Sequence, residues 1–428
     1  MPRRQSESGR ERARALDAAD ELGAFRQRFE LPRRGRHALV YLCGHSLGLM
    51  PRAARRAVER ELDRWAGRGV DGHFTDSDDS GWLDYHERFT KPLAALVGAR
   101  PAEVVAMNTL TVNLHLMLAS FFRPAGCRRK IVIERDAFSS DRYVVQSQLR
   151  HHGLDPANDL LELAPSSTTR RLELGDFRSL LEAHGEQVAL VLLPGVQYLT
   201  GERLDVAAFT AEARRFDCRV GFDLAHAIGN VPLGLHDAGA DFAVWCSYKY
   251  LNAGPGAVGG CFVHERWSGD PALPRLAGWW GHDRTTRFAM PRDFAPLPGA
   301  AGWQLSNPPI LSLAPLAASL EIFREAGLAK LRKKSLRLTR FLEEELAAVL
   351  GERISLLTPK EPERRGCQLS LEIPTSPSST AVLARLHAAG IVADARAPNV
   401  LRFAPVPLYN RYADAYAAVR GLRTALDA

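Results

Sequence analysis

The stretch Trp245-Cys246-Ser247-Tyr248-Lys249-Tyr250-Leu251-Asn252 places one lysine at the end of an apolar run. Phe242 to Tyr248 has the aromatic and β-branched residues that are typical of a buried strand, and a Gly-Pro-Gly turn follows shortly after it. A lysine in this position usually extends its ammonium group to solvent. The alternative is an amine kept partly away from water, whose pKa falls so that it acts as a nucleophile or a base.

The stretch Val220 to Ala227 predicts a second short apolar strand, which ends in Asp223 and is followed by His226. Alone, Asp223 would be interpreted as a loop acid or a helix N-cap. Together with Lys249 it indicates a site for pyridoxal phosphate, because the aldehyde of this cofactor binds a lysine amine and its ring nitrogen needs a carboxylate. We therefore predict that Lys249 and Asp223 are catalytic residues.

The middle of the chain alternates predicted strands with predicted helices, which is the pattern of a parallel sheet with helical crossovers. Such a sheet binds its ligand beyond the carboxyl ends of its strands. We predict an α/β fold with strands Lys130 to Glu134, Val188 to Leu193, Arg219 to Asp223 and Val258 to His264, the last one antiparallel, and helices Pro51 to Trp65, Asp141 to His152 and Val206 to Phe216.

The chain is long enough for one large and one smaller domain, and its character changes near Pro308. We predict a solvated helical segment over residues 1–36, a large cofactor-binding α/β domain over 37–307, with its first part free to pack on the small domain, and a small α+β domain over 308–428. The small domain is expected to contain one long helical stretch, Leu311 to Leu350, strands Gln368 to Ile373, Ile391 to Asp394 and Leu401 to Phe403, and helices Ser379 to Ala389 and Arg411 to Leu426.

The composition of the 428-residue sequence is that of an ordinary soluble protein. Its 56 Lys and Arg against 49 Asp and Glu give a net charge of +7. Because no basic run with interleaved aromatic residues is present, this excess favours a small anionic ligand over nucleic acid. Six widely spaced cysteines form no C-x-x-C pair and indicate a reduced, cytoplasmic protein without a structural zinc. The sequence predicts neither a secretory signal nor a membrane span.

Three further segments carry residues suited to ligand binding. Thr109 and Thr111 begin a predicted helix, whose free N–H groups form a natural phosphate site or are simply capped by a threonine. In Phe138-Ser139-Ser140-Asp141 the aromatic ring suits stacking on a flat ligand, while Asp141 is either a hydrogen-bonding group or a helix cap. Arg402 lies inside an apolar strand, where an arginine either forms a structural pair or clamps a carboxylate.

Two turns have open interpretations. In Gly44-His45-Ser46-Leu47-Gly48-Leu49 the backbone is able to approach a ligand or another element closely. His73 belongs to a predicted loop that continues into Asp76 to Asp79, and it is either a surface residue or a substrate contact. Neither turn decides between its two interpretations by itself.

These motifs together resemble those of the kynureninases, fold-type-I pyridoxal phosphate enzymes, from about Tyr41 to Leu426. The resemblance implies a large domain with a mostly parallel sheet of the seven-stranded type and a homodimer with its active sites at the subunit interface. It also implies hydrolysis of L-kynurenine or its 3-hydroxy form to anthranilate or 3-hydroxyanthranilate and L-alanine, in tryptophan degradation. The matching segments, in the order of the family, are Leu110 to His115, Gly221 to Asn230, Trp245 to Gly254, Gly278 to His282, Ser306 to Ile310 and Arg402 to Asn410.

By this resemblance, Lys249 carries the cofactor, Asp223 faces its pyridine nitrogen, and Phe138 stacks on its ring. Tyr248 is the candidate for relaying a proton, and Arg402 would grip the α-carboxylate of the substrate. The implied cofactor-binding residues, some of them from the neighbouring subunit, are Leu110, Thr111, Phe138, Ser139, Ser140, Asp141, Asp223, His226, Tyr248, Lys249, Trp279 and Asn307. The implied substrate-binding residues are Ser46, His73, Ser306, Asn307 and Arg402.

Three positions depart from the pattern that the resemblance leads us to expect. His45 stands in place of an asparagine, Ser139 in place of a proline, and Pro194 in place of a hydroxyl residue that contacts the cofactor. Pro194 offers neither a hydroxyl nor an N–H group, so this contact is absent or replaced. His45 lies near the predicted substrate pocket, and it is a candidate for setting the preference between kynurenine and its 3-hydroxy form.

Two other kinds of function fit part of the pattern. A cysteine desulfurase or an aminotransferase of the same fold would share Asp223, His226 and Lys249. A desulfurase, however, needs a cysteine on a mobile loop, and Cys367 directly precedes a predicted strand. A binding protein that keeps the fold without turnover is supported only by Pro194 and His45.

Overall fold

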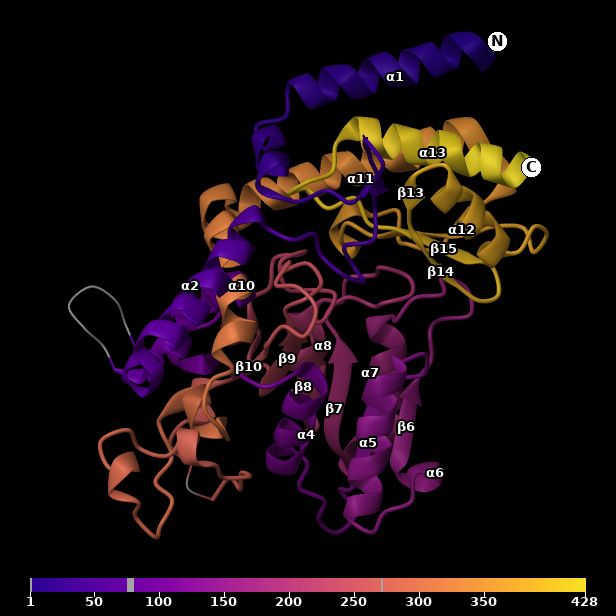
Figure 1. Cartoon of the computed structure of the whole chain (residues 1–428). Coiled ribbons are helices and arrows are strands. Elements are labelled where there is room, and N and C mark those ends of the chain that lie inside the picture. The colour runs from indigo at the N-terminus through magenta and orange to yellow at the C-terminus, as the bar shows by residue number, and fades with distance from the viewer. Residues whose placement is uncertain (1, 75–80, 271) are drawn as a thin grey trace.

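The computed structural model describes residues 2–74, 81–270 and 272–428, so the predicted loop at Asp76 to Asp79 lies outside the described residues. Its large sheet has seven strands in the order β4-β10-β9-β8-β7-β5-β6 (Figure 1). The strands β5 to β9 run parallel, whereas β10 is antiparallel to both of its neighbours. The predicted α/β fold is confirmed. The bounds are β4 (Val104–Ala106), β5 (Lys130–Glu134), β6 (Leu160–Leu163), β7 (Val188–Pro194), β8 (Arg219–Asp223), β9 (Phe242–Cys246) and β10 (Gly259–Val263).

Helices cover both faces of this sheet. Alternate residues along β7 point to opposite faces, so Val191 and Leu193 belong to one hydrophobic core, and Leu190 and Leu192 belong to the other. Strands buried on both faces are apolar at every position, which is why they are recognisable in the sequence as unbroken apolar runs. The first core includes residues of α3 (Thr90–Val97), α7 (Leu174–His184), α8 (Val206–Arg214) and α10 (Ile310–Ala326), and the second includes residues of α4 (Leu110–Phe121) and α5 (Ser139–His151).

The long helical stretch predicted over Leu311 to Leu350 is wrong in one respect. It consists of two helices, α10 and α11 (Leu328–Leu350), that are separated at Gly327. Gly327 has a φ of 75°, a left-handed conformation that ends one helix and that glycine adopts without steric cost. The predicted helix after Pro51 is confirmed as α2 (Arg52–Arg68), with Pro51 itself as the N-cap residue.

A second sheet of four strands, in the order β11-β12-β15-β14, lies above the first in Figure 1. With α11, α12 (Ser379–Ala388) and α13 (Tyr412–Asp427) it forms a third hydrophobic core. The predicted strand Ile391 to Asp394 is wrong in its extent, because it is divided into β13 and β14, which belong to different sheets. The strands are β11 (Ser355–Leu356), β12 (Leu369–Glu372), β13 (Ile391–Val392), β14 (Asp394–Arg396) and β15 (Val400–Phe403).

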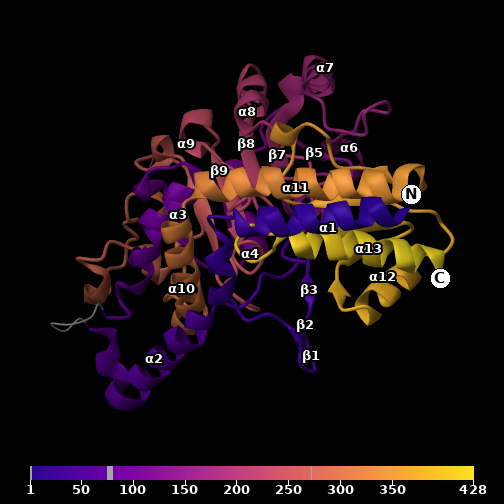
Figure 2. The ribbon, with the colours of Figure 1, turned by 90° about the horizontal axis from the view of Figure 1, so that it is seen from above.

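The beginning of the chain packs on its end. The helix α1 (Pro2–Ala18) lies beside α11 and α13 (Figure 2), and β3 (Val40–Tyr41) pairs in parallel with β13. The Asp17 carboxylate accepts hydrogen bonds from the N–H groups of Tyr412 at 2.7 Å and Ala413 at 3.1 Å, so it caps the first turn of α13. Since α10 shares a core with the large sheet, the domain division at residues 307 and 308 stays a prediction.

The shorter elements connect these layers. They are β1 (Arg33–Arg34), β2 (His37–Ala38), α6 (Pro156–Asp159), α9 (Leu235–Ala238), and, among the short 3-10 helices, η2 (Gly69–His73), η7 (Trp279–Gly281) and η9 (Gly299–Trp303). All six cysteines are free. None of the helices within the described ranges combines the length and the apolar character needed to cross a bilayer.

The turn from Gly44 to Leu49 packs directly on the loop that carries Lys249. The N–H of Gly48 donates a hydrogen bond to the carbonyl oxygen of Tyr248 at 2.8 Å. A Cβ atom at residue 48 would lie only 2.2 Å from the carbonyl oxygen of Lys249, so only glycine permits this approach. The close approach expected at this turn is therefore a contact with another element of the same chain.

Candidate active site

Lys249 and Asp223 line one cavity at the carboxyl edge of the large sheet. Asp223 is the last residue of β8, Lys249 follows shortly after β9, and these two strands are parallel neighbours with Asp223 opposite Val244. Because parallel strands end at the same edge, the sequence pattern brings both side chains together. The cavity is lined by Leu110, Thr111, Glu134, Phe138, Ser140, Asp141, Pro194, Val196, Tyr198, Asp223, Ala225, His226, Tyr248 and Lys249.

Three carboxyl groups are buried around this cavity, and they do not all carry charge. Burial raises the pKa of Asp223, but the charge of Lys249 and a hydrogen bond of 2.6 Å from the N–H of Ala225 both favour its ionised form. Burial and the neighbouring charge of Asp223 hold the pKa of Asp141 well above its usual range. Burial raises the pKa of Glu134 to about 8. Asp141 therefore holds its proton more tightly than Asp223, so that Asp223 is the member of this pair that ionises first, and Glu134 keeps its proton at neutral pH.

His226 and Phe138 offer two rings to the same cavity. Burial and the charge of Lys249 hold the pKa of His226 well below its usual range, so this imidazole is neutral. Its Nδ1 is buried and finds no hydrogen-bond partner within the described part of the chain. The Phe138 ring centroid lies 5.8 Å from the Nζ of Lys249 and 5.3 Å from the ring centroid of Tyr198. A flat ligand with polar atoms on its rim would suit these surroundings.

Two helices begin at one side of the cavity. The helix α4 starts at Leu110 after Thr109, and α5 starts at Ser139 after Phe138. The side chain of neither N-cap residue accepts a hydrogen bond from its helix, so the first N–H groups remain available to an anion. The hydroxyl oxygens of Thr111 and Ser140 are 2.9 Å apart, which joins the two helix starts. This arrangement favours the phosphate site predicted from the sequence over a simple threonine cap.

Tyr248 contributes a hydroxyl group to the cavity. Burial raises the pKa of Tyr248, so the phenol keeps its proton at neutral pH. Its ring centroid lies 5.8 Å from the Nζ of Lys249. The phenol and the amine are therefore close enough to act on the same ligand.

Arg402 lies on β15 with its side chain almost fully buried. Its Nη1 donates to the carbonyl oxygen of Tyr198 at 2.6 Å, and its Nη2 donates to Oδ2 of Asp394 at 2.6 Å. Its Nε is buried and has no hydrogen-bond partner within residues 2–74, 81–270 and 272–428. Two groups thus orient the guanidinium, while the Nε–H and the second N–H of each terminal nitrogen have no hydrogen-bond partner in the described part of the chain and are left for a ligand.

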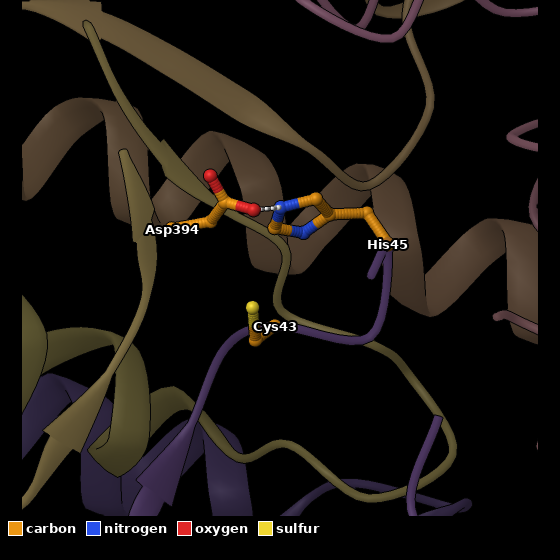
Figure 3. A group of neighbouring side chains, drawn as sticks. All are labelled: Cys43, His45 and Asp394. Atoms are coloured by element: carbon orange, nitrogen blue, oxygen red, sulfur yellow. Dashed lines mark ion pairs between the residues drawn. The ribbon is translucent and has the colours of Figure 1, made fainter. Parts of the chain in front are cut away.

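Asp394 also contacts a second arginine and a histidine. The Nη1 of Arg396 donates to it at 2.8 Å, and the Nε2 of His45 lies 3.7 Å away and faces it (Figure 3). Burial alone would raise the pKa of Asp394, but His45 and Arg402 together hold it well below its usual range. Burial lowers the pKa of His45 to about 4, so its ring is neutral at pH 7. The ring centroids of His45 and His226 are 6.3 Å apart, which connects this group to the cavity.

Several residues predicted for the site do not line this cavity within one chain. His73 ends η2, where its Nδ1 lies 3.0 Å from the carbonyl oxygen of Val70 and its ring packs against Trp82. Trp279 is 42% exposed and donates its Nε1–H to the carbonyl oxygen of Arg287 at 3.2 Å. Four further predicted residues outside the cavity lining are exposed, namely Ser46, Ser139, Ser306 and Asn307. Their roles stay predictions.

The cavity also contains residues that the sequence did not single out. Glu134 ends β5, and a buried acid at the end of an apolar strand is the same signal that marks Asp223. Tyr198 links Phe138 to Arg402 through its ring and its carbonyl oxygen. Asp394 gave no signal, because its role depends on an arginine that approaches it from a neighbouring strand. Pro194 lines the cavity opposite Asp223 in the sheet and supplies no polar contact there.

The fold is shared with solved structures of known chemistry. One is a complex of the cystine C–S lyase C-DES with cysteine persulfide, with a TM-score of 0.76, 18% identity, and coverage of 91% of this chain and 98% of that one. Another is the cysteine desulfurase CsdA from Escherichia coli, with a TM-score of 0.76, 18% identity, and coverage of 95% and 98%. This fold, with a lysine and an ionised aspartate facing one cavity, defines a fold-type-I pyridoxal phosphate-dependent enzyme.

The chain belongs to the kynureninase family. It is 54% identical over 411 residues to a kynureninase from Xanthomonas oryzae pv. oryzae, covering 96% of both chains. It is 52% identical over 416 residues to a kynureninase from Xanthomonas campestris pv. campestris, covering 97% of both. The family model described as the kynureninase C-terminal domain matches residues 331–422. The family and the cofactor predicted from the sequence are confirmed, and the fold class of the neighbouring structures agrees with them.

The alternative of a cysteine desulfurase is not favoured by the structure either. Cys367 is buried, and its backbone N–H donates to Oδ1 of Asn230 at 2.9 Å. Burial raises the pKa of the Cys367 thiol to about 12, so this group is not a thiolate at neutral pH. A buried and protonated thiol next to a strand is therefore unsuited to act as the mobile-loop nucleophile of a desulfurase.

The charge assignment within the acidic pair predicts opposite outcomes for two matched variants. Asp141→Asn replaces a protonated carboxyl with a neutral amide and should leave cofactor affinity within about threefold of wild type. Asp223→Asn removes the acid that ionises first and should weaken cofactor affinity at least about tenfold, which corresponds to about 1.4 kcal/mol. Titration of each apoprotein with pyridoxal phosphate, followed by visible absorption, measures both affinities. Equal losses in the two variants would contradict the assignment.

Proposed function

We propose that this chain hydrolyses L-kynurenine and 3-hydroxy-L-kynurenine to anthranilate or 3-hydroxyanthranilate and L-alanine in tryptophan degradation. The observation that carries the proposal is the pair Lys249 and Asp223, which lines one cavity in a chain that is 54% identical to a kynureninase over nearly its whole length. Arg402, close to this cavity, adds a buried guanidinium with a free Nε for the carboxylate of an amino acid.

The residues around the cavity fit pyridoxal phosphate. Asp223 would face the pyridinium nitrogen, His226 and Phe138 would lie along the ring, and the starts of α4 and α5 would hold the phosphate. The buried polar atoms without partners within the described residues, Nδ1 of His226 and Oδ1 of Asp141, are those that such a ring would supply with contacts. When bound, the cofactor withdraws electrons from the α-carbon of an amino acid that is attached to it.

Lys249 and Tyr248 would move the protons of the reaction. The amine of Lys249 would hold the cofactor, and with an amino acid bound in its place Nζ would be free to accept the proton of the substrate α-carbon. The hydroxyl of Tyr248 holds its proton at neutral pH, so it donates this proton to the substrate in the later steps. In this scheme water adds to the side-chain ketone, and the bond between the β- and γ-carbons breaks.

Arg402 would bind the α-carboxylate of the substrate. Asp394 and the carbonyl oxygen of Tyr198 fix the plane of its guanidinium before substrate arrives, which lowers the entropic cost of binding. His45 packs between Asp394 and the cavity as a neutral, fully buried ring. His45 stays our candidate for setting the preference between kynurenine and its 3-hydroxy form, because its ring centroid lies 6.3 Å from that of His226 in the cavity lining.

We further propose a homodimer whose partner subunit completes each site. Several predicted site residues, among them Trp279 and Asn307, are exposed and lie outside the cavity of their own chain. A groove of about 740 Å³ runs along α2 and the Lys249 loop, and exposed apolar side chains surround it, including Leu47, Met50, Leu62 and Leu311. A second copy covering this face would bury the apolar groups and bring its own residues to the site. The free cysteines are compatible with the cytoplasm.

The function is tested by turnover of L-kynurenine. Wild-type protein should have a visible absorption band from lysine-bound cofactor and should release fluorescent anthranilate together with alanine. Lys249→Ala should lose this absorption band. Its kcat should fall at least about 10⁴-fold, because the variant lacks both the cofactor attachment and the base. Lys360→Ala, which removes an exposed lysine, is the matched control and should behave as wild type. If wild type produces no anthranilate, the proposed function is wrong.

The carboxylate clamp is tested by a pair of arginine variants. Arg402→Ala should raise KM for kynurenine by about 10- to 100-fold, the loss expected for a hydrogen bond to a charged group, while the visible band stays intact. Arg396→Ala removes the other arginine on Asp394 and should change KM less than about threefold, since Arg402 keeps its contact with Asp394. An unchanged KM in Arg402→Ala would remove the assigned role from this residue.

The shared site is tested by subunit complementation. If Asn307 acts on the site of the partner subunit, Lys249→Ala and Asn307→Ala damage different halves of each site. Mixing the two nearly inactive variants under conditions that exchange subunits should then restore about a quarter of wild-type activity, because half of the dimers are mixed and each has one intact site. No recovery, with mixed dimers demonstrated by differently tagged subunits, would place Asn307 in the site of its own chain.

A further inference from the structure

A second cavity, of about 590 Å³, lies at the opposite edge of the large sheet. Arg219, the first residue of β8, lines this cavity, whereas Asp223, the last residue of the same strand, lines the first one. The four residue steps along β8 from Arg219 to Asp223 span about 13 Å. We call this second cavity the arginine cleft, after the five arginines in its lining, which are Arg123, Arg128, Arg214, Arg219 and Arg266.

Two of these arginines are fixed parts of the wall. The Nη1 of Arg128 donates to the carbonyl oxygens of Val188 at 2.7 Å and Phe216 at 2.8 Å. The Nη2 of Arg266 donates to Oδ1 of Asp241 at 2.9 Å. Both guanidinium groups therefore hold strands and loops together and add positive charge at fixed positions.

The other three arginines have no polar partner in the part of the chain that the structure describes. Arg123, Arg214 and Arg219 are exposed, and in the described part of the chain their guanidinium groups form neither a hydrogen bond nor an ion pair. Burial and the charge of Arg266 lower the pKa of Arg214. Only two carboxylates, Asp217 and Asp241, line the same cleft. Like charges brought together without partners raise the energy of the free protein, and an anion would relieve this repulsion.

The ends of two helices explain why two of these arginines are stable where they lie, but not why all three meet at one cleft. Arg214 lies in the last turn of α8 and Arg123 shortly follows α4, where cations interact favourably with the helix dipole. Arg219, however, begins a strand and reaches the cleft from a third element. Its guanidinium lies 4.2 Å from the ring centroid of Trp267, and that contact holds it at the cleft.

We propose that the arginine cleft binds a small polyanion with two or more linked phosphate groups. Linked phosphate groups offer acceptor oxygens to guanidinium groups from all three elements. One phosphate or one carboxylate would engage only one or two of these guanidinium groups. The volume of the cleft is within the range of small-molecule sites. Of the aromatic residues in the described lining, Trp267 lies under both Arg219 and Arg266, and Phe121 is buried, so the recognition is of the phosphate groups.

The test is calorimetric titration of the cofactor-loaded enzyme with tripolyphosphate at low ionic strength. We expect one binding event per chain, weakened by added NaCl, with inorganic phosphate binding at least tenfold more weakly. The visible band of the cofactor is recorded in the same samples. If binding occurs only as this band disappears, tripolyphosphate is occupying the phosphate site of the cofactor, and the proposal is overturned.

Two double variants with the same loss of charge separate the cleft from general basicity. Arg123→Ala with Arg214→Ala removes two exposed arginines of the cleft and leaves the contact of Arg219 with Trp267 in place. Arg36→Ala with Arg292→Ala removes two exposed arginines elsewhere. The first pair should weaken tripolyphosphate binding at least tenfold and the second less than twofold, with kynurenine turnover unchanged in both. Equal weakening by the two pairs, or no saturable binding by wild type, would overturn the proposal.

Discussion

A negative charge in a place that water barely reaches is the condition on which this active site depends. Asp223 is buried at the end of β8, where an isolated carboxylate would be far less stable than in solvent. The positive charge of Lys249 and the N–H of Ala225 supply what water would otherwise provide. Because β8 and β9 are parallel neighbours, the two charges meet at one edge of the sheet without any special loop.

The surrounding acids are compatible with this charge because they are neutral. Asp141 and Glu134 are buried within the same cavity lining, and three carboxylates there would repel one another strongly. Burial raises the pKa of both of them, so Asp223 is the acid of this lining that ionises first. Neutral acids also donate hydrogen bonds, which gives the cavity both donors and acceptors for a ligand with polar atoms on its rim.

The sequence was most informative where apolar runs end in polar residues. Such runs predict the bounds of β5 and β8 and the pair Asp223 and Lys249. Short unbroken apolar runs are the pattern of strands that are buried on both faces. The break at Gly327 was missed because both flanking segments are strong helix formers. The contact between Arg402 and Asp394 was not predictable, because it joins two strands whose pairing no local pattern specifies. The exposure of Trp279 and Asn307 in one chain is likewise invisible to local patterns.

The glycine contact at residue 48 connects the active site to segments that are far away in the sequence. Gly48 touches the backbone of Lys249, and a Cβ at the neighbouring Gly44 would lie 2.3 Å from the hydroxyl of Tyr409. The wall behind the reactive lysine thus joins segments near residues 44, 249 and 409, which are far apart in the sequence. The turn at Gly44 to Gly48, the loop at Lys249 and the segment at Tyr409 must therefore all be folded together before this wall is complete. The wall behind the reactive lysine is thus a product of the tertiary fold and not of any single segment of the sequence.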